Sequence, residues 1–132
     1  MYLTRKQFRE GVLARDNYKC VICPRTDDLA AHHILERRLW GASEGYYIDN
    51  GASLCPQHHI EAEQTVLSCE AIREAARIEQ ILLPEHLYKD NRYDKWGSII
   101  LPDGRRLKGE LFFDESVQKI LKRGGVLEEF CE

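Results

Sequence analysis

The sequence predicts an α+β fold in which a small strand–loop–strand–helix nucleus lies between an N-terminal helix and a C-terminal helix–hairpin–helix extension. Three observations predict it. Helix-capping residues precede three segments with helical apolar spacing. A short apolar run and a second, briefer one flank a strong turn signal. A Pro-Asp-Gly turn separates two β-rich runs near the C-terminus. The length of 132 residues fits one domain, residues 1–132.

The N-terminal helix is expected to begin after a capping box. Thr4 can accept a hydrogen bond from the backbone of Gln7, and the Gln7 side chain can reach back to the Thr4 backbone. A helix from there to about Arg15 places Phe8 and Val12 on one face, where helical periodicity predicts burial.

The nucleus combines two short strands with a helix. The stretch 29–35 is apolar apart from two histidines and is short enough for a strand, and 36–47 has a loop composition. Asp-Asn-Gly at 49–51 is a turn signal before a brief second strand over 52–54. From residue 58 the pattern becomes helical to about residue 67.

The extension is expected to hold two more helices and a hairpin. A serine cap precedes a predicted helix that runs to about Leu83 and stops at a proline. The runs 97–101 and 105–113 flank Pro-Asp-Gly at 102–104 and predict a β-hairpin. A last helix over 115–123 has an aspartate cap before it and a glycine after it.

Charge is unevenly distributed along the chain, whose net charge is −3. Residues 1–40 carry eight Lys/Arg against five Asp/Glu, residues 41–90 three against nine, and residues 91–132 eight against eight. The N-terminal part is therefore mildly basic, and the charge neither establishes nor excludes a nucleic-acid partner. No apolar run approaches the roughly 20 residues of a membrane span, and the charged N-terminus lacks a signal-peptide core. We expect a cytoplasmic protein with no membrane partner.

Two matched half-sites predict a structural zinc. Cys20-x-x-Cys23 can direct two thiolates at one ion, and Cys55-Pro-Gln-His58 has the same spacing with an imidazole as fourth ligand. Together they form a closed, tetrahedral Cys₃His set. Zinc would compensate for a nucleus too short to bury enough apolar surface on its own.

The five cysteines also allow other interpretations. Cys20 and Cys23 could form a redox pair, although the chain has no βαβ unit beside them, or could stay unliganded thiols. Cys69 and Cys131 have no ligand-like spacing and are interpreted as incidental or buried thiols.

A second set of polar residues lies inside the first. His32 and His33 stand on the predicted first strand, Asn50 precedes the return strand, and His59 directly follows the second zinc half. The order Cys-x-x-Cys, His-His-Ile, Asn-Gly, Leu-Cys-x-x-His-His resembles the HNH endonuclease family (ββα-metal, His-Me finger nucleases), in its zinc-containing His-His subgroup. The resemblance covers about residues 16 to 65, roughly 40% of the chain. It implies a ββα-metal core over 16–66 and an accessory region over 67–132.

The resemblance also implies roles for these residues. His32 would be a ligand of a catalytic divalent ion, and His33 the general base. Asn50 would orient the loop and the base and, in some family members, help to coordinate the metal. His59 would be a further ligand of the catalytic ion.

The residues themselves give partial support. His32 and His33 are adjacent on a strand and point to opposite faces, so twist or a bulge is needed for both to reach one substrate. His59 and Glu63 share a helix face, which makes Glu63 a candidate third ligand, or else a solvated carboxylate. Glu63 departs from the family, where some members carry His or Asn at this turn. His58 and His59 could exchange roles, although the spacing from Cys55 favours His58 on zinc.

The expected function is hydrolysis of DNA phosphodiester bonds with one divalent ion, Mg²⁺ or Mn²⁺, Ni²⁺, Co²⁺ or Zn²⁺, and a histidine base that activates water. Arg37 and Arg38 follow the first strand and are candidates for phosphate contacts. A catalytically inactive, zinc-stabilised module for nucleic-acid binding or protein interaction is the alternative. A redox or metal-storage role would leave the histidines unexplained. A monomer with one site would nick DNA, whereas a dimer could cut both strands.

Overall fold

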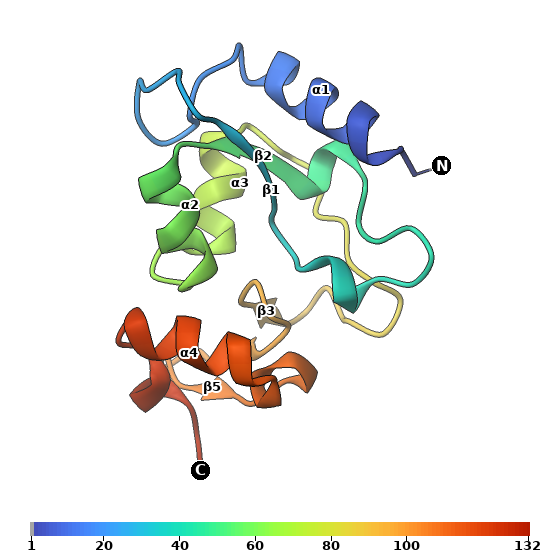
Figure 1. Ribbon diagram of the computed structural model, residues 1–132. Helices are drawn as coiled ribbons and strands as arrows, with labels where there is room; N and C mark the ends of the chain where they lie inside the picture. Colours follow the sequence, from blue (N-terminus) through green and yellow to red (C-terminus); the bar gives the residue numbers. More distant parts are fainter. Residues whose placement is uncertain (1) are drawn as a thin grey trace.

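The computed structural model describes residues 2–132 and has an α+β fold with four α-helices and two small antiparallel sheets among them (Figure 1). Short 3₁₀ turns connect several elements. The helices and strands are, in order, α1 (Arg5–Arg15), β1 (Ala30–His33), β2 (Gly51–Leu54), α2 (Pro56–Glu63), α3 (Cys69–Ala75), β3 (Arg92–Tyr93), β4 (Ile99–Ile100), β5 (Arg106–Leu107) and α4 (Glu115–Arg123).

The β1–β2 pair forms the middle layer of the nucleus. Helix α1 lies along one side of the pair, and α2 and α3 lie on the other (Figure 1). The antiparallel register runs without interruption from Ala30 opposite Leu54 to His33 opposite Gly51. The ladder therefore has no bulge, and successive β1 side chains alternate between the two sides.

Helix α1 follows the sequence prediction and is tied to β2. Both hydrogen bonds of the predicted capping box are present, and Phe8 and Val12 are buried. At its C-terminal end the Arg15 guanidinium donates to the backbone carbonyls of Ile48 (2.9 Å) and Gly51 (2.7 Å). These bonds satisfy carbonyl groups at the start of β2 and orient the helix across the strands.

Helix α3 is shorter than predicted. The expected serine cap is present, since Ser68 accepts from the Ala71 backbone, but the helix ends at Ala75 and does not reach Leu83. Arg77 adopts a left-handed conformation (φ 60°). Its backbone N–H donates to the Glu74 carbonyl, and the backbone N–H of Ile78 donates to the Arg73 carbonyl. This Schellman arrangement satisfies the last helical carbonyls. This turn packs Ile78 against the core, whereas continuing the helix beyond Ala75 would not.

Helix α2 also differs from the prediction at both ends. It begins at Pro56, two residues before the expected start, because proline is favoured in the first helical turn. It ends at Glu63 and not near Leu67, since Thr65 turns into the left-handed region (φ 63°).

From β3 onward the extension forms a second layer below the nucleus in Figure 1, whereas its first helix, α3, packs with the nucleus. The hairpin of β4 and β5 around residues 102–104 confirms the predicted turn, and β3 adds a third strand that the sequence pattern did not predict. Helix α4 confirms the last prediction, because Asp114 accepts from the backbone of Ser116 and Val117. A separate apolar cluster packs this layer, comprising Trp96, Phe112, Val117, Leu121, Val126 and Phe130.

Polar bonds connect the extension to the nucleus. The indole Nε1 of Trp96 donates to the Glu63 carbonyl at 2.8 Å. The buried Arg106 guanidinium donates to Asp94 Oδ2 (3.0 Å) and to the Thr65 hydroxyl (2.6 Å). Bonds to buried charged groups are stronger than neutral ones. The two layers are therefore joined through specific side chains as well as through apolar contact.

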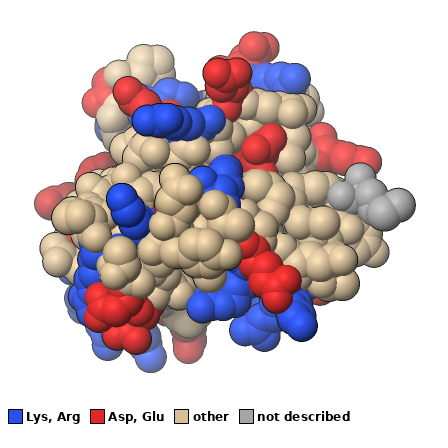
Figure 2. Space-filling model, turned by 90° about the horizontal axis from the view of Figure 1, so that it is seen from above, with Lys and Arg blue, Asp and Glu red and all other residues tan. Residues whose placement is uncertain are grey.

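The surface carries charges of both signs. Figure 2 looks onto the side formed by α1 and shows lysine and arginine side chains interspersed with acidic ones around a broad uncharged area. Within residues 2–132, no helix has both the length and the apolar character needed to cross a lipid bilayer.

The close approach of α1 to β2 predicts that Gly51 is sensitive to substitution. A Cβ at Gly51 would lie 2.5 Å from Val12 Cγ2 and 2.7 Å from Phe8 Cζ. We expect Gly51→Ala to lower the free energy of unfolding by about 1–3 kcal/mol, measured by urea denaturation. The matched control is Gly41→Ala, where nothing lies within 4 Å of the added Cβ. Equal stabilities for the two variants would contradict this account of the packing.

Candidate functional site

Four predicted zinc ligands converge at one end of the nucleus. Cys20, Cys23, Cys55 and His58 offer ligand atoms that all lie within 4.8 Å of one another. Cys23 Sγ is 3.8 Å from Cys55 Sγ, and His58 Nδ1 is 3.7 Å from Cys20 Sγ and 3.2 Å from Cys55 Sγ. A tetrahedral zinc with its usual bond lengths has edges of about 3.8 Å between sulfurs and about 3.6 Å between sulfur and nitrogen. The cluster can bind a structural metal such as zinc.

Local structure directs these four side chains together. Cys20 donates its backbone N–H to the Arg25 carbonyl, which closes the turn that carries the first half-site. The next residue, Val21, donates to the Ser53 carbonyl of β2, so the turn lies beside the second half-site. Cys55 is the N-cap of α2, and His58 lies in the first turn of that helix. The fourth position is taken by His58 and not by His59, which decides the alternative that the sequence left open.

The cysteines of the cluster are free thiols and suited to metal binding. All five cysteines of the chain are unbridged. Burial disfavours ionisation of Cys55, but hydrogen bonds from the His58 backbone and side chain and from the neighbouring thiols lower its pKa to about 7. The thiolate is the form that ligates a metal. By contrast, burial raises the pKa of Cys69 to about 12, which agrees with an unreactive core thiol.

His32, His59 and Glu63 lie together on the α2 side of β1. The rings of His32 and His59 are 5.2 Å apart edge to face, and His59 Nε2 is 3.2 Å from Glu63 Oε1. His32 is 2% exposed, and both of its ring nitrogens are buried without a hydrogen-bond partner. Two imidazoles and a carboxylate suit a divalent transition metal, and an ion would satisfy an orphan nitrogen. The group therefore has the donor types predicted for a catalytic ion.

These three side chains are adjacent without converging as the cysteine cluster does. Among residues 2–132, the Cys₃His cluster is the one group of three or more such ligands whose atoms all lie within 4.8 Å. Burial, followed by the charge of Lys95, lowers the pKa of His32 well below its usual value, and burial also lowers that of His59. Burial therefore favours the neutral imidazole, which is the metal-binding form.

Lys95 is a site residue that the sequence did not reveal. Its side chain is buried, and Nζ donates to the backbone carbonyl of His33 at 2.6 Å and lies 3.7 Å from Glu36 Oε2. Burial lowers the pKa of Lys95, while Glu36 and Glu63 oppose that shift. It stands 62 residues after His33 in the extension, with no motif around it. Only the packing of the extension on β1 brings this ammonium to the histidines.

His33 points to the opposite side, toward α1. Its ring stacks on Phe8 (4.6 Å between centroids) and meets Tyr46 edge-on at 5.0 Å. Burial, then the charges of Lys95 and Arg37, lower the pKa of His33 to about 3, while a hydrogen bond to the Glu44 backbone raises it. Nε2 is buried and has no hydrogen-bond partner among residues 2–132. With a pKa of about 3 the ring is neutral and only a weak base at neutral pH.

Asn50 holds the loop and does not contact His33 or the ligand group. Its Oδ1 accepts from the Leu35 backbone (3.1 Å), and its Nδ2 donates to the carbonyls of Leu35 (3.2 Å) and Gly45 (3.1 Å). The Asn50 residue is 1% exposed, and its side-chain hydrogen bonds are all made to backbone groups. Of the roles expected for it, the geometry supports loop orientation. The His33 ring is positioned by its packing against Phe8 and Tyr46.

The two candidate phosphate ligands have different surroundings. Arg37 lines a cavity beside His33, with its guanidinium 5.5 Å from the centre of the Tyr46 ring. Arg38 instead donates to Asp114 Oδ2 at 2.9 Å and to Glu36 at 3.3 Å. Its guanidinium therefore joins the nucleus to the extension, and the two arginines are not equivalent.

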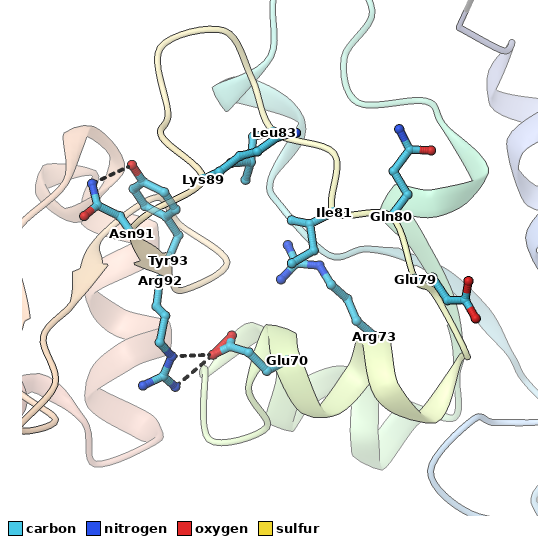
Figure 3. Close-up of a pocket in the computed structure, with 10 residues that line it drawn as sticks. All are labelled: Glu70, Arg73, Glu79, Gln80, Ile81, Leu83, Lys89, Asn91, Arg92 and Tyr93. Carbon is cyan, nitrogen blue, oxygen red and sulfur yellow. Dashed lines mark hydrogen bonds and ion pairs between the residues drawn. The ribbon is translucent and has the colours of Figure 1, made fainter.

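A separate cavity of ≈ 390 Å³ lies between α3 and β3 (Figure 3). The Arg92 guanidinium is paired with Glu70 at 2.8 Å beside it, and Arg73 and Ile81 project into it from opposite walls. None of the predicted site residues lines this cavity. It is therefore a different place from the histidine groups.

No family model matches the chain, and neither a curated protein nor a solved structure matches it. The functional argument consequently rests on the chain's own residues and their geometry.

The cluster predicts that metal removal unfolds the nucleus. We expect the purified protein to hold one zinc in the cluster, and chelation or Cys20→Ser to lower the free energy of unfolding by more than about 4 kcal/mol. Metal analysis and thermal unfolding measure both effects. Cys131→Ser is the matched control, because that thiol lies outside the cluster and should leave zinc content and stability unchanged. Full stability of a zinc-free protein would contradict the structural role.

The bonds of Asn50 predict a mainly structural effect of its loss. Asn50→Ala would leave the Leu35 N–H and the carbonyls of Leu35 and Gly45 buried without partners. We expect it to lower the free energy of unfolding by about 2–5 kcal/mol in urea denaturation. Asn91→Ala, an exposed asparagine with one side-chain bond to Tyr93, should change stability by less than about 1 kcal/mol. An unchanged stability of Asn50→Ala would reject the loop-orienting role.

Proposed function

We propose that the chain is a metal-dependent endonuclease of the HNH, ββα-metal type that hydrolyses phosphodiester bonds in DNA. The observation that carries the proposal is the state of His32. Its ring is buried with two unpartnered nitrogens, beside His59 and Glu63 and next to a His33 whose Nε2 is also free. Burying such nitrogens without a partner is costly, and an ion and a reacting water would supply the missing partners.

The proposed chemistry assigns a task to each of these side chains. His33 would accept a proton from water at Nε2, which has no hydrogen-bond partner. His32, His59 and Glu63 would hold the divalent ion, Mg²⁺ or Mn²⁺, Ni²⁺, Co²⁺ or Zn²⁺. When bound, that ion supplies Lewis-acid stabilisation of the charge on the phosphate and the leaving oxygen. Asn50 keeps the loop between β1 and β2 in the shape that this arrangement needs.

One observation favours a second candidate, a zinc-stabilised binding module without catalysis. The β1–β2 register has no bulge, so His32 faces α2 and His33 faces α1. The atoms of the proposed ion site also do not converge as those of the cysteine cluster do. A module that only binds would need the cysteine cluster and the loop, and would need neither a base nor a second ion.

Cleavage of supercoiled plasmid separates the two candidates. We expect the wild type to nick DNA when Mg²⁺, Mn²⁺, Ni²⁺ or Co²⁺ is added, and His33→Ala to lose about 100-fold or more of that rate at unchanged zinc content. The matched control is His86→Ala, because His86 is exposed and paired with Glu110 away from the motif. Its rate should equal that of the wild type.

Two results would overturn the nuclease. A folded, zinc-loaded wild type that cuts with none of these ions would favour the binding module. Equal rates for His33→Ala and the wild type would remove His33 as the base.

A further inference from the structure

A cavity of ≈ 230 Å³ beside His33 is lined by three arginines and by no acidic side chain. Arg5 and Arg9 come from α1, and Arg37 comes from the turn after β1. The remaining lining residues are apolar or aromatic, apart from His33 itself, and include Phe8 and Tyr46. Positive charge is therefore concentrated around this one cavity.

The arginines retain donors for a ligand. Arg5 and Arg9 are one helical turn apart and share a face of α1. Arg5 makes no side-chain hydrogen bond or ion pair with any residue from 2 to 132, and Arg9 uses one nitrogen for the Leu29 carbonyl at 3.2 Å. Arg37 is paired with Glu44, yet its planar group still faces the Tyr46 ring that lines the cavity.

His33 lines the cavity, and its Nε2 is buried without a hydrogen-bond partner among residues 2–132. Guanidinium groups match the paired oxygens of a phosphate and bind it through parallel hydrogen bonds. A hollow lined by three guanidinium groups, two aromatic rings and an imidazole suits an anionic phosphate ester. A phosphodiester has this chemistry.

We propose that this cavity binds a backbone phosphate of the DNA strand and that Arg5 and Arg9 make α1 a DNA-contacting helix. The proposal rests on the proposed function, since it takes DNA as the substrate, and it extends the contact beyond Arg37 to a helix outside the resembling segment. Contacts of this kind read the backbone and not the bases, so the binding is sequence-independent and strongly salt-dependent.

The test measures binding apart from cleavage. A fluorescent DNA duplex is titrated with His59→Ala protein, which lacks a proposed metal ligand but keeps the cavity, and binding is followed by anisotropy between about 50 and 200 mM salt. Introducing Arg5→Ala and Arg9→Ala into the His59→Ala protein should weaken its binding to the duplex about tenfold or more. It should also reduce the slope of log affinity against log salt by about 2.

The matched control removes two positive charges elsewhere. Lys6→Ala/Lys122→Ala changes exposed lysines of α1 and α4 that do not line the cavity, and it should leave affinity and slope nearly unchanged. All variants are first checked for zinc content and thermal stability. Three results would each overturn the proposed phosphate site. They are an equal loss of affinity in both double variants, an unchanged salt slope in Arg5→Ala/Arg9→Ala, and no DNA binding at all.

Failure of the cavity and failure of the nuclease give different results. A wild type that cuts plasmid while Arg5→Ala/Arg9→Ala keeps its salt slope rejects the phosphate cavity and retains the nuclease. A protein that binds DNA through these arginines but never cuts it retains the cavity and rejects the nuclease.

Discussion

The convergence of Cys20, Cys23, Cys55 and His58 is the constraint on which the nucleus depends. The sheet it encloses has two strands of four residues, and a two-stranded pair of this length is marginally stable in water. A tetrahedral ion bound there would join the turn before β1 to the start of α2, and would thereby set how α2 lies against the strands. The distance between His32 on β1 and His59 on α2 follows from that geometry, because the cluster and His59 share the first turns of one helix.

The extension contributes to the site as well as to stability. The buried ammonium of Lys95 donates to the His33 carbonyl, and the Trp96 indole donates to the Glu63 carbonyl, so both ends of the histidine region are tied to the same short segment. The position of Lys95 also has an electrostatic consequence. The positive charge of Lys95 disfavours a metal cation beside His32, and the negative charges of Glu36 and Glu63 oppose that effect.

The β1 strand separates two chemically different surfaces. On the α2 side His32 lies beside the His59–Glu63 pair, whereas on the α1 side His33 faces arginines. Alternation along an unbulged strand produces this separation. In the proposed nuclease a phosphate must meet both surfaces. β1 ends at His33, and the backbone then turns toward Arg37. The two surfaces therefore come closest to each other at this end of the strand.

Sequence by itself determined the local elements and the cysteine cluster. Thr4, Ser68 and Asp114 identify helix starts because capping depends on neighbouring residues, and the paired x-x spacings identify zinc ligands because two short turns fix their geometry. Tertiary structure decided the rest. Arg77 ends α3 early because Ile78 packs on the core, and Lys95 reaches His33 across 62 residues of chain. The arginine cavity likewise exists only because α1 packs on β1. Contacts between distant segments depend on how whole faces pack, and no local pattern encodes that.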